Sequence, residues 1–162
     1  MGVSGCGKST VAGVLAGQLG WDFGEGDDLH PPENVAKMAA GHPLTDEDRL
    51  PWLDRVAAWI RERTDRGRPG IITCSALKRS YRDVLRGEHV VFVFLDGTKE
   101  QIAARLAVRH GHYMPSVLLD SQFADLERPG PDERAVRIDI GPAAAVQAGQ
   151  IVEMLSLIPA PE

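Results

Sequence analysis

Positive charge is scarce in this sequence. The 162 residues include 18 lysines and arginines against 23 aspartates and glutamates, so the formal net charge at pH 7 is −5. A protein that binds nucleic acid through its phosphate backbone needs a basic face. The acidic balance therefore argues against a nucleic-acid partner, although it leaves room for a local basic pocket.

Cysteines and long apolar runs are also few. The two cysteines, Cys6 and Cys74, are far apart and form no C-x-x-C pattern. No stretch is apolar for long enough to span a membrane, and we recognise no secretory signal. We therefore expect reduced thiols in a cytoplasmic protein without a membrane partner. The length suits one compact domain over residues 1–162.

The chain opens with a phosphate-binding pattern. The first ten residues read MGVSGCGKST, and they match G-x-x-x-x-G-K-[ST] from Gly2 to Ser9. Glycines let successive N–H groups curl around a phosphate, and the dipole of the following helix favours the anion. We expect Lys8 to meet the β- and γ-phosphates of ATP and Ser9 to offer its hydroxyl to Mg²⁺. The expected nucleotide-binding residues of this loop are Gly2, Val3, Ser4, Gly5, Cys6, Gly7, Lys8, Ser9 and Thr10.

Helical and strand-like segments alternate after this loop. Val11, Val14, Leu15 and Leu19 recur with helical spacing, and Gly20 ends that helix. Strands are expected at residues 21–26, 71–75, 90–95 and 135–140, and helices at 32–40, 81–86, 98–109 and 143–157. Residues 45–50 read as a polar turn, after which Pro51 begins another helix. The alternation predicts an α/β fold with a parallel sheet and right-handed crossovers.

The loop lacks the strand from which such loops normally hang. Only Met1 precedes Gly2. Either apolar residues are missing upstream, or the domain lacks its middle strand. A gap would leave neighbouring strands with unpaired edges inside the core. We therefore favour the first explanation and expect an apolar strand upstream in the native product.

Acidic residues follow the first expected strand. The stretch Gly24-Glu25-Gly26-Asp27-Asp28-Leu29-His30 places carboxylates at the carboxyl end of a strand, where α/β sheets bind ligands. One carboxylate could orient or deprotonate an acceptor hydroxyl, and another could hold Mg²⁺ through water. An acidic surface loop is the alternative interpretation.

Basic residues near the expected crevice suit an acidic acceptor. Arg49 stands just before Pro51, and Lys78 and Arg82 follow the strand expected at 71–75. An arginine can bind a carboxylate through two parallel hydrogen bonds. Solvated charge on a helix surface is the alternative for each of them.

Residues 110–134 are polar with scattered glycine and proline, and they predict a lid that closes over ATP and excludes water. Arg105 and Arg109 lead into this stretch on one helix face. One of them could pack on adenine and the other could touch the transferred phosphoryl group. A solvated helix end whose cations complement the dipole is the alternative.

Three stretches together resemble the gluconokinase family: GDDLHPPENVAKMAAGHPLTDEDRLPWL, ITCSALKRSYRDVLR and GHYMPSVLLDSQFADLE. The resemblance runs from Gly2 to about Ile140, and its motifs G-D-x-x-H-P-x-x-N and C-S-A-L-K are not general features of P-loop proteins. It implies a three-layer P-loop NTPase fold like that of nucleoside-monophosphate kinases. This fold has the strand order 2-3-1-4-5 and a lid over about residues 110–134, here without the first strand. It also implies a homodimer that phosphorylates D-gluconate on its 6-hydroxyl with ATP and Mg²⁺.

The same resemblance implies residue roles. Asp27 is the expected catalytic base, and Glu25 is expected near the Mg²⁺ shell with Ser9. Lys8 and Arg109 complete the expected catalytic residues, and Arg105 joins the nucleotide-binding ones. The expected substrate-binding residues are Asp27, His30, Arg49, Ser75, Lys78 and Arg82.

Other functions remain as alternatives. A shikimate kinase would carry glycines where this chain has Ser75-Ala76-Leu77-Lys78. A GTP-dependent switch needs N-K-x-D, yet the only asparagine, Asn34, is followed by Val-Ala-Lys. Residues 25–50 contain no Phe, Tyr or Trp on which a nucleoside acceptor could stack. A nucleotide-binding protein without turnover is the last alternative.

Overall fold

The computed structural model describes residues 1–109 and 116–162, and in that part of the chain strands and helices alternate. The elements are α1 (Lys8–Leu19), β1 (Asp22–Glu25), the 3-10 helix η1 (Gly26–Leu29), α2 (Pro32–Ala39), α3 (Asp46–Asp65), β2 (Gly70–Thr73), α4 (Arg79–Leu85), β3 (Phe92–Asp96), α5 (Lys99–Ala107), α6 (Ser116–Asp125), β4 (Ala135–Asp139) and α7 (Ala144–Leu155). The predicted α/β fold is confirmed.

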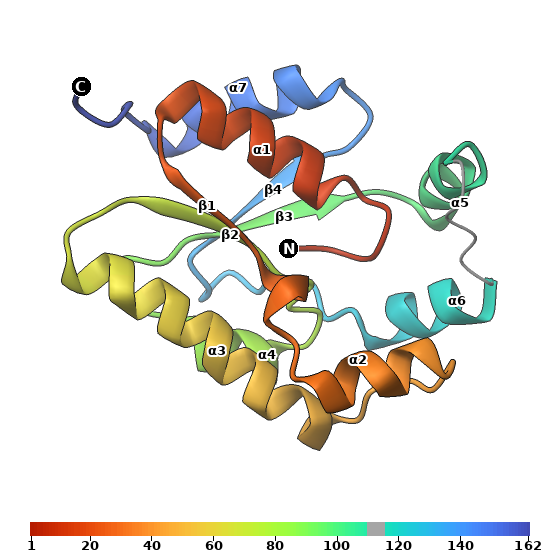
Figure 1. The fold of residues 1–162 in the computed structure, drawn as a ribbon. Coiled ribbons are helices and arrows are strands. Elements are labelled where there is room, and N and C mark those ends of the chain that lie inside the picture. Colours follow the sequence, from red (N-terminus) through yellow and green to blue (C-terminus); the bar gives the residue numbers. More distant parts are fainter. Residues whose placement is uncertain (110–115) are drawn as a thin grey trace.

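Helices cover both faces of the strand layer (Figure 1). α1 and α7 lie side by side on one face, and α3 and α4 lie on the other. The apolar core is accordingly split into two clusters. Leu15, Ile138 and Ile151 belong to the cluster under α1 and α7, whereas Trp52 and Val56 belong to the cluster under α3. None of the helices in the described ranges combines the length and apolarity needed to cross a membrane.

The strands form two parallel pairs. β1 pairs with β2 from Asp22 opposite Gly70 to Glu25 opposite Thr73. β3 pairs with β4 from Phe92 opposite Ala135 to Asp96 opposite Asp139. The expected order 2-3-1-4-5 would put a central strand between the two pairs. In the described residues the sheet is instead divided there, and the order is β1-β2 and β3-β4.

Met1 and Gly2 lie between the two pairs and bond to both. The Met1 amine donates to the Val93 carbonyl at 2.6 Å, and the Leu95 N–H donates to the Met1 carbonyl at 3.0 Å. On the other side, the Gly2 N–H donates to the Ser75 carbonyl at 3.1 Å. These bonds have the pattern of a parallel strand. The two residues therefore occupy the last positions of a central strand.

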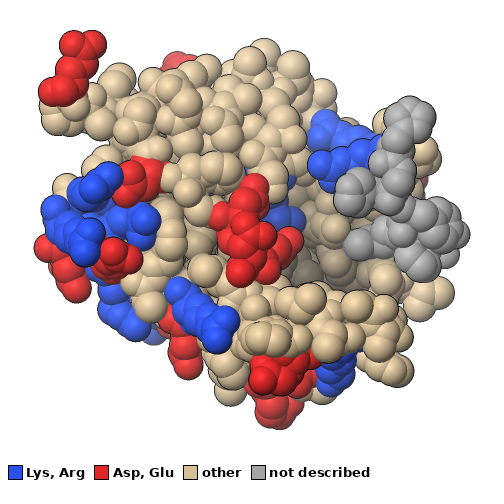
Figure 2. Space-filling view, in the orientation of Figure 1, with Lys and Arg blue, Asp and Glu red and all other residues tan. Residues whose placement is uncertain are grey.

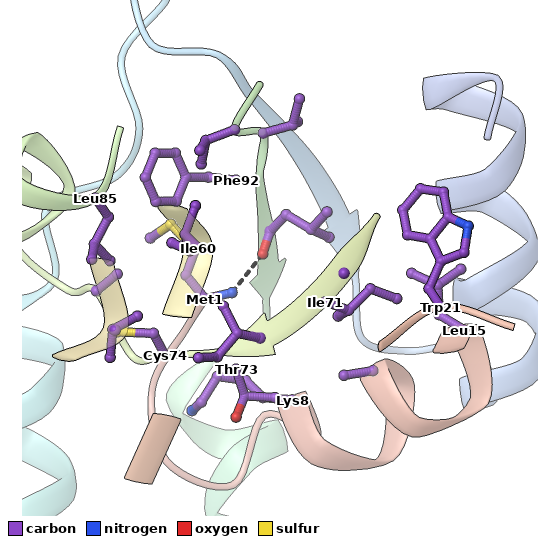
Figure 3. A pocket seen from close by; sticks show the side chains of 18 of the residues that line it. Met1, Lys8, Leu15, Trp21, Ile60, Ile71, Thr73, Cys74, Leu85 and Phe92 are labelled. Carbon is purple, nitrogen blue, oxygen red and sulfur yellow. Dashed lines mark hydrogen bonds between the residues drawn. The ribbon is translucent and has the colours of Figure 1, made fainter. Parts of the chain in front are cut away.

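An apolar cavity of about 350 Å³ extends from Met1 between β2 and β3 (Figure 3). Its lining includes Ile60, Ile71 and Phe92. The Met1 amine is buried at its end, and burial, followed by the positive charge of Lys8, lowers the pKa of this amine from 8.0 to about 6. The cavity thus separates strand edges that a complete sheet would pair.

The start of α3 differs from the prediction. Residues 46–50, expected as a turn, form its first turns, and Pro51 lies inside the helix. The reason is a capping box at Thr45. Its hydroxyl accepts from the Asp48 N–H at 3.1 Å, and the Asp48 carboxylate accepts from the Thr45 N–H at 2.9 Å. These bonds satisfy helix-start N–H groups upstream of the proline.

Part of the stretch predicted as a polar lid is a packed helix. α6 carries Leu119, whose side chain is only 3% exposed and belongs to the same core cluster as Ile102 and Leu106 of α5. Residues 110–115 of the expected lid lie outside the described residues. On the face shown in Figure 2, the surface is hollowed beside a group of acidic side chains near its middle.

Candidate functional site

The phosphate-binding loop leads into α1 as the sequence predicts. Gly7 caps the helix with φ 98°, no side chain caps this end, and the first turn carries no acidic residue. The first N–H groups of any α-helix have no intrahelical partner, so this end is open to an anion. Gly5 also has a positive φ, and a Cβ there would come within 2.9 Å of the Leu106 side chain. The side chains of Val3 and Cys6 are buried, which leaves only their backbone for a nucleotide.

Two expected cations lie at this loop. The Lys8 ammonium donates to the carbonyls of Gly2 at 2.9 Å and Val3 at 3.1 Å. No carboxylate in the described parts of the chain pairs with Lys8, so its charge is available to a phosphate. The Arg105 guanidinium lies beside the loop, 3.5 Å from the Cys6 carbonyl. The other lid-side cation, Arg109, lies exposed just beyond the end of α5.

The two expected metal-site residues meet. The Ser9 hydroxyl donates to the Glu25 carboxylate at 3.0 Å, and the Thr73 hydroxyl donates to the same oxygen at 2.6 Å. Thr73 also accepts from the Gly26 N–H at 3.2 Å, so it fixes the end of β1. Sequence reasoning missed Thr73, because no motif marks a threonine at the end of β2. No cluster of three or more His, Cys, Asp or Glu side chains suited to a metal occurs in the described residues.

Asp27 and His30 lie on or next to η1, beyond the carboxyl end of β1. Asp27 is exposed, whereas the His30 ring stacks on Trp52 with a centroid distance of 4.3 Å. Burial lowers the pKa of His30. The charge of Asp27 raises this pKa and that of Arg49 lowers it, and the lowering effects prevail. The Asn34 amide donates to His30 Nδ1 at 3.3 Å, so the neutral ring carries its proton on Nε2. His30 therefore offers one N–H donor.

Arg49 and Lys78 form a group with two residues that sequence reasoning missed, Asp46 and Tyr81. Arg49 donates to the Tyr81 hydroxyl at 2.9 Å, and this hydroxyl donates to Asp46 at 2.5 Å. Lys78 donates to the same carboxylate at 3.1 Å. The hydrogen bonds from Tyr81 and then Lys78 lower the pKa of Asp46. Two cations around one carboxylate make this a place where an acidic ligand can bind.

Arg82 requires a correction. It was expected to bind substrate, but its side chain is only 1% exposed. Its guanidinium donates to both Glu133 oxygens, and to the carbonyls of Ala76 at 2.9 Å and Leu77 at 3.2 Å. The buried face of α4 turns this cation inward. Arg82 therefore braces the segment Ser75–Lys78, in which Ala76 has the unusual φ of 46°, and presents no donor to the hollow.

Several of the expected residues thus lie at the carboxyl ends of β1 and β2 and at the start of α1, whereas Arg49 is on α3 and Arg105 and Arg109 are on or beyond α5. In the space-filling view, acidic side chains near the middle of the face border the recess, and basic atoms are visible behind them (Figure 2). The site thus combines an anion-binding loop, a hydroxyl-carboxylate group beside it, and a pair of cations at the starts of α3 and α4. Such an arrangement suits transfer of a phosphoryl group to an acidic acceptor.

Comparisons with known proteins agree with this geometry. A sequence model of the shikimate kinase family matches residues 4–128. A gluconokinase from Gluconobacter oxydans (strain 621H) is 55% identical over 140 residues, which are 85% of this chain and 79% of that protein. A crystal structure of a gluconokinase from Sinorhizobium meliloti 1021 is 45% identical with a TM-score of 0.80, and the match covers 96% of this chain and 93% of that one.

A further crystal structure, of an unliganded sugar kinase from Janibacter sp. HTCC2649, is 48% identical with a TM-score of 0.91. That match covers 98% of this chain and 93% of the other. The predicted P-loop kinase fold is confirmed by these matches and by the family model. The relatives from Gluconobacter oxydans and Sinorhizobium meliloti, and one from Escherichia coli (strain K12) at 51% identity, are named gluconokinase. The chain belongs to the gluconokinase family.

Proposed function

We propose that this protein transfers the γ-phosphoryl group of ATP to the 6-hydroxyl of D-gluconate, giving ADP and 6-phospho-D-gluconate. The observation that carries the proposal is that one structure holds an open phosphate-binding loop, an exposed Asp27 just beyond β1, and the two cations Arg49 and Lys78. Gluconate is proposed as the acceptor because the relatives are named gluconokinase. An acid with many hydroxyls also suits the cations Arg49 and Lys78 and the N–H donor of His30.

The nucleotide half of the site needs little movement. The N–H groups at the start of α1 would donate to the phosphate oxygens, and the Lys8 ammonium would move from the two carbonyls to those oxygens. Arg105 stands beside the loop for the nucleotide, and Arg109 is proposed to neutralise charge on the moving group. These cations act by position and charge, because phosphoryl transfer asks little covalent chemistry of the protein.

The group formed by Ser9, Glu25 and Thr73 suits Mg²⁺ by its donor chemistry, since hydroxyl and carboxylate oxygens are the ligands this ion takes. Ser9 and Glu25 would hold the ion together with the phosphates of ATP. When bound, the ion would offset negative charge on the phosphates. The hydrogen bond from Thr73 holds the Glu25 carboxylate next to Ser9.

On the acceptor side, Asp27 would orient the 6-hydroxyl and take its proton as the phosphoryl group arrives. Arg49 and Lys78 would bind the carboxylate of gluconate, and His30 would donate its Nε2 hydrogen to one of the other hydroxyls. Ser75, which follows β2 and precedes the residues that Arg82 contacts, is proposed to bind the substrate as well. The predicted homodimer and cytoplasmic location stay predictions.

A coupled assay of ADP release tests the proposal directly. D-gluconate, shikimate and a set of nucleoside monophosphates are offered as acceptors at equal concentration, with Lys8→Ala as the inactive control. We expect ADP release with gluconate alone. A preference for shikimate would favour the other small-molecule kinase, and ATP binding without release on any acceptor would favour a nucleotide-binding protein without turnover.

A further inference from the structure

A residue of α6 contacts the phosphate-binding loop. The Ser4 N–H donates to the side-chain oxygen of Gln122 at 2.6 Å, across 118 positions of sequence. The orientation of this amide follows from chemistry, because a backbone N–H must meet the oxygen rather than the nitrogen. Gln122 lies in the stretch SQFADLE, which forms part of α6 and the residues after it.

Helix α6 holds this side chain firmly in place. Leu119, one turn before Gln122, is buried with Ile102 and Leu106 of α5, and Phe123 packs against the same cluster. The chain after the helix is also fixed, since the Glu127 N–H donates to the Leu77 carbonyl at 2.8 Å. Gln122 is thus presented to the loop from a packed support.

The contact lies at the end of the loop where the outer phosphates of ATP are expected. The Lys8 ammonium, the proposed partner of the β- and γ-phosphates, rests on the carbonyls of Gly2 and Val3, and Ser4 is the next residue. The Gln122 amide nitrogen has no hydrogen-bond partner within residues 1–109 and 116–162. Among the described residues, its N–H groups are therefore available to a ligand at this end of the loop.

We propose that Gln122 binds the terminal phosphate of ATP. Its oxygen stays on the Ser4 N–H, and its amide nitrogen donates to an oxygen of the γ-phosphate. This inference rests on the proposed function, because it takes ATP as the ligand of the loop. Its consequence is that α6 distinguishes a nucleoside triphosphate from a diphosphate.

The test compares ATP with ADP. Dissociation constants of both nucleotides are measured calorimetrically with Mg²⁺ and without acceptor, for wild type and for Gln122→Met, which keeps the length of the side chain but not its hydrogen bonds. We expect the constant for ATP to rise about 10-fold and that for ADP to change less than about twofold, as for one lost bond to a charged group. Gln122→Glu should weaken ATP further, because it sets an anion against the phosphate.

A matched control makes the same change elsewhere. Gln18→Met alters an exposed glutamine on α1, and it should leave both constants unchanged. If Gln122→Met does not fold, Gln122→Asn serves instead, because its shorter side chain cannot hold Ser4 and reach the phosphate together.

The outcomes separate the two claims. Equal losses for ATP and ADP would mean that Gln122 only supports the loop, and unchanged constants would mean that it has no role in binding; either result overturns this inference and leaves the proposed function standing. A wild-type protein that binds neither nucleotide would overturn both.

Discussion

The space between β2 and β3 is occupied differently at its two ends. At the carboxyl end, Met1 bonds to β3, Gly2 bonds to Ser75 just beyond β2, and both lead into the phosphate-binding loop. Away from that end, an apolar cavity of about 350 Å³ lies between the same strands, and no chain in the described residues fills it. The first region is held by backbone hydrogen bonds, whereas the second is an apolar cavity.

The comparison separates what the site needs from what the fold needs. The loop requires only that its first residues be held at the end of a strand, and three backbone bonds supply that. Stability depends on the whole length of paired edge and on the apolar area buried beside it. Changes at the loop end should therefore affect catalysis, whereas changes at the cavity should affect the free energy of unfolding.

The largest expected effect belongs to the catalytic side. Asp27→Asn keeps the shape of an exposed side chain but removes the base, so we expect kcat with gluconate to fall about 10²- to 10³-fold. The dissociation constant for ATP and the melting temperature should hardly change. The coupled assay of ADP release, calorimetry and thermal unfolding measure these three quantities.

Asp28→Asn is the matched control, since this neighbour on η1 is also exposed and has no assigned role. It should leave kcat near that of wild type. An unchanged kcat for Asp27→Asn would remove this residue as the base, and a lowered melting temperature would break the separation between the two ends.

Local patterns predicted the loop end well. The motif from Gly2 to Ser9 and the helix after it depend on neighbouring residues, and so does the capping box of α5, in which Thr98 accepts from the Gln101 N–H. The alternation of strand-like and helical segments predicted four strands with bounds close to the observed ones. Such features can be read from sequence because the groups that form them are only a few positions apart.

Features that join distant elements could not be predicted. Thr73 on β2 meets Glu25 on β1, and Tyr81 on α4 meets Asp46 on α3, through contacts that no spacing encodes. Arg82 was misplaced for the same reason, since a short helix does not reveal which side of it faces Glu133. The start of α3 was predicted too late, because Pro51 was given more weight than the Thr45 cap.

The second prediction fills the cavity. An engineered extension of about five apolar residues before Met1 should pair with the facing edges of β2 and β3 and raise the free energy of unfolding by ~3 kcal/mol. The bonds of Met1 to Val93 and Leu95 set its register, so the residue two positions before Met1 should bond to Val91 and Val93. Urea unfolding measures the gain.

An extension of equal length made of serine and glycine is the control, because it can form the same backbone bonds but buries little apolar surface. It should stabilise the protein much less. Equal stabilities for the two extended proteins and the original chain would mean that the cavity is not a strand site. A change in kcat would show that the two ends are coupled.

The third prediction concerns the buried amine at the boundary of the two regions. Burial lowers the pKa of the Met1 amine from 8.0 to about 6, so the unfolded chain binds more protons between these values. The stability contributed by the neutral amine is therefore present above pH 8 and lost as the pH falls towards 6. The loss over this range should be about 2 kcal/mol in urea unfolding. Acetylation of the amine should abolish this loss of stability. If the acetylated protein kept the same pH dependence, the loss would have to come from another group.

The smallest effect is expected at the acceptor side, where Arg49 meets Tyr81. Arg49→Ala should raise the KM for gluconate about 10-fold, because one charge-assisted bond to the carboxylate is lost, and leave the KM for ATP unchanged. Arg49→Lys keeps the charge but not the planar fork, so it should recover part of the affinity. Arg61→Ala, on an exposed position of the same helix, is the control. A rise confined to the KM for ATP would show that Arg49 binds the nucleotide, and the assignment of Arg49 to the gluconate carboxylate would then be wrong.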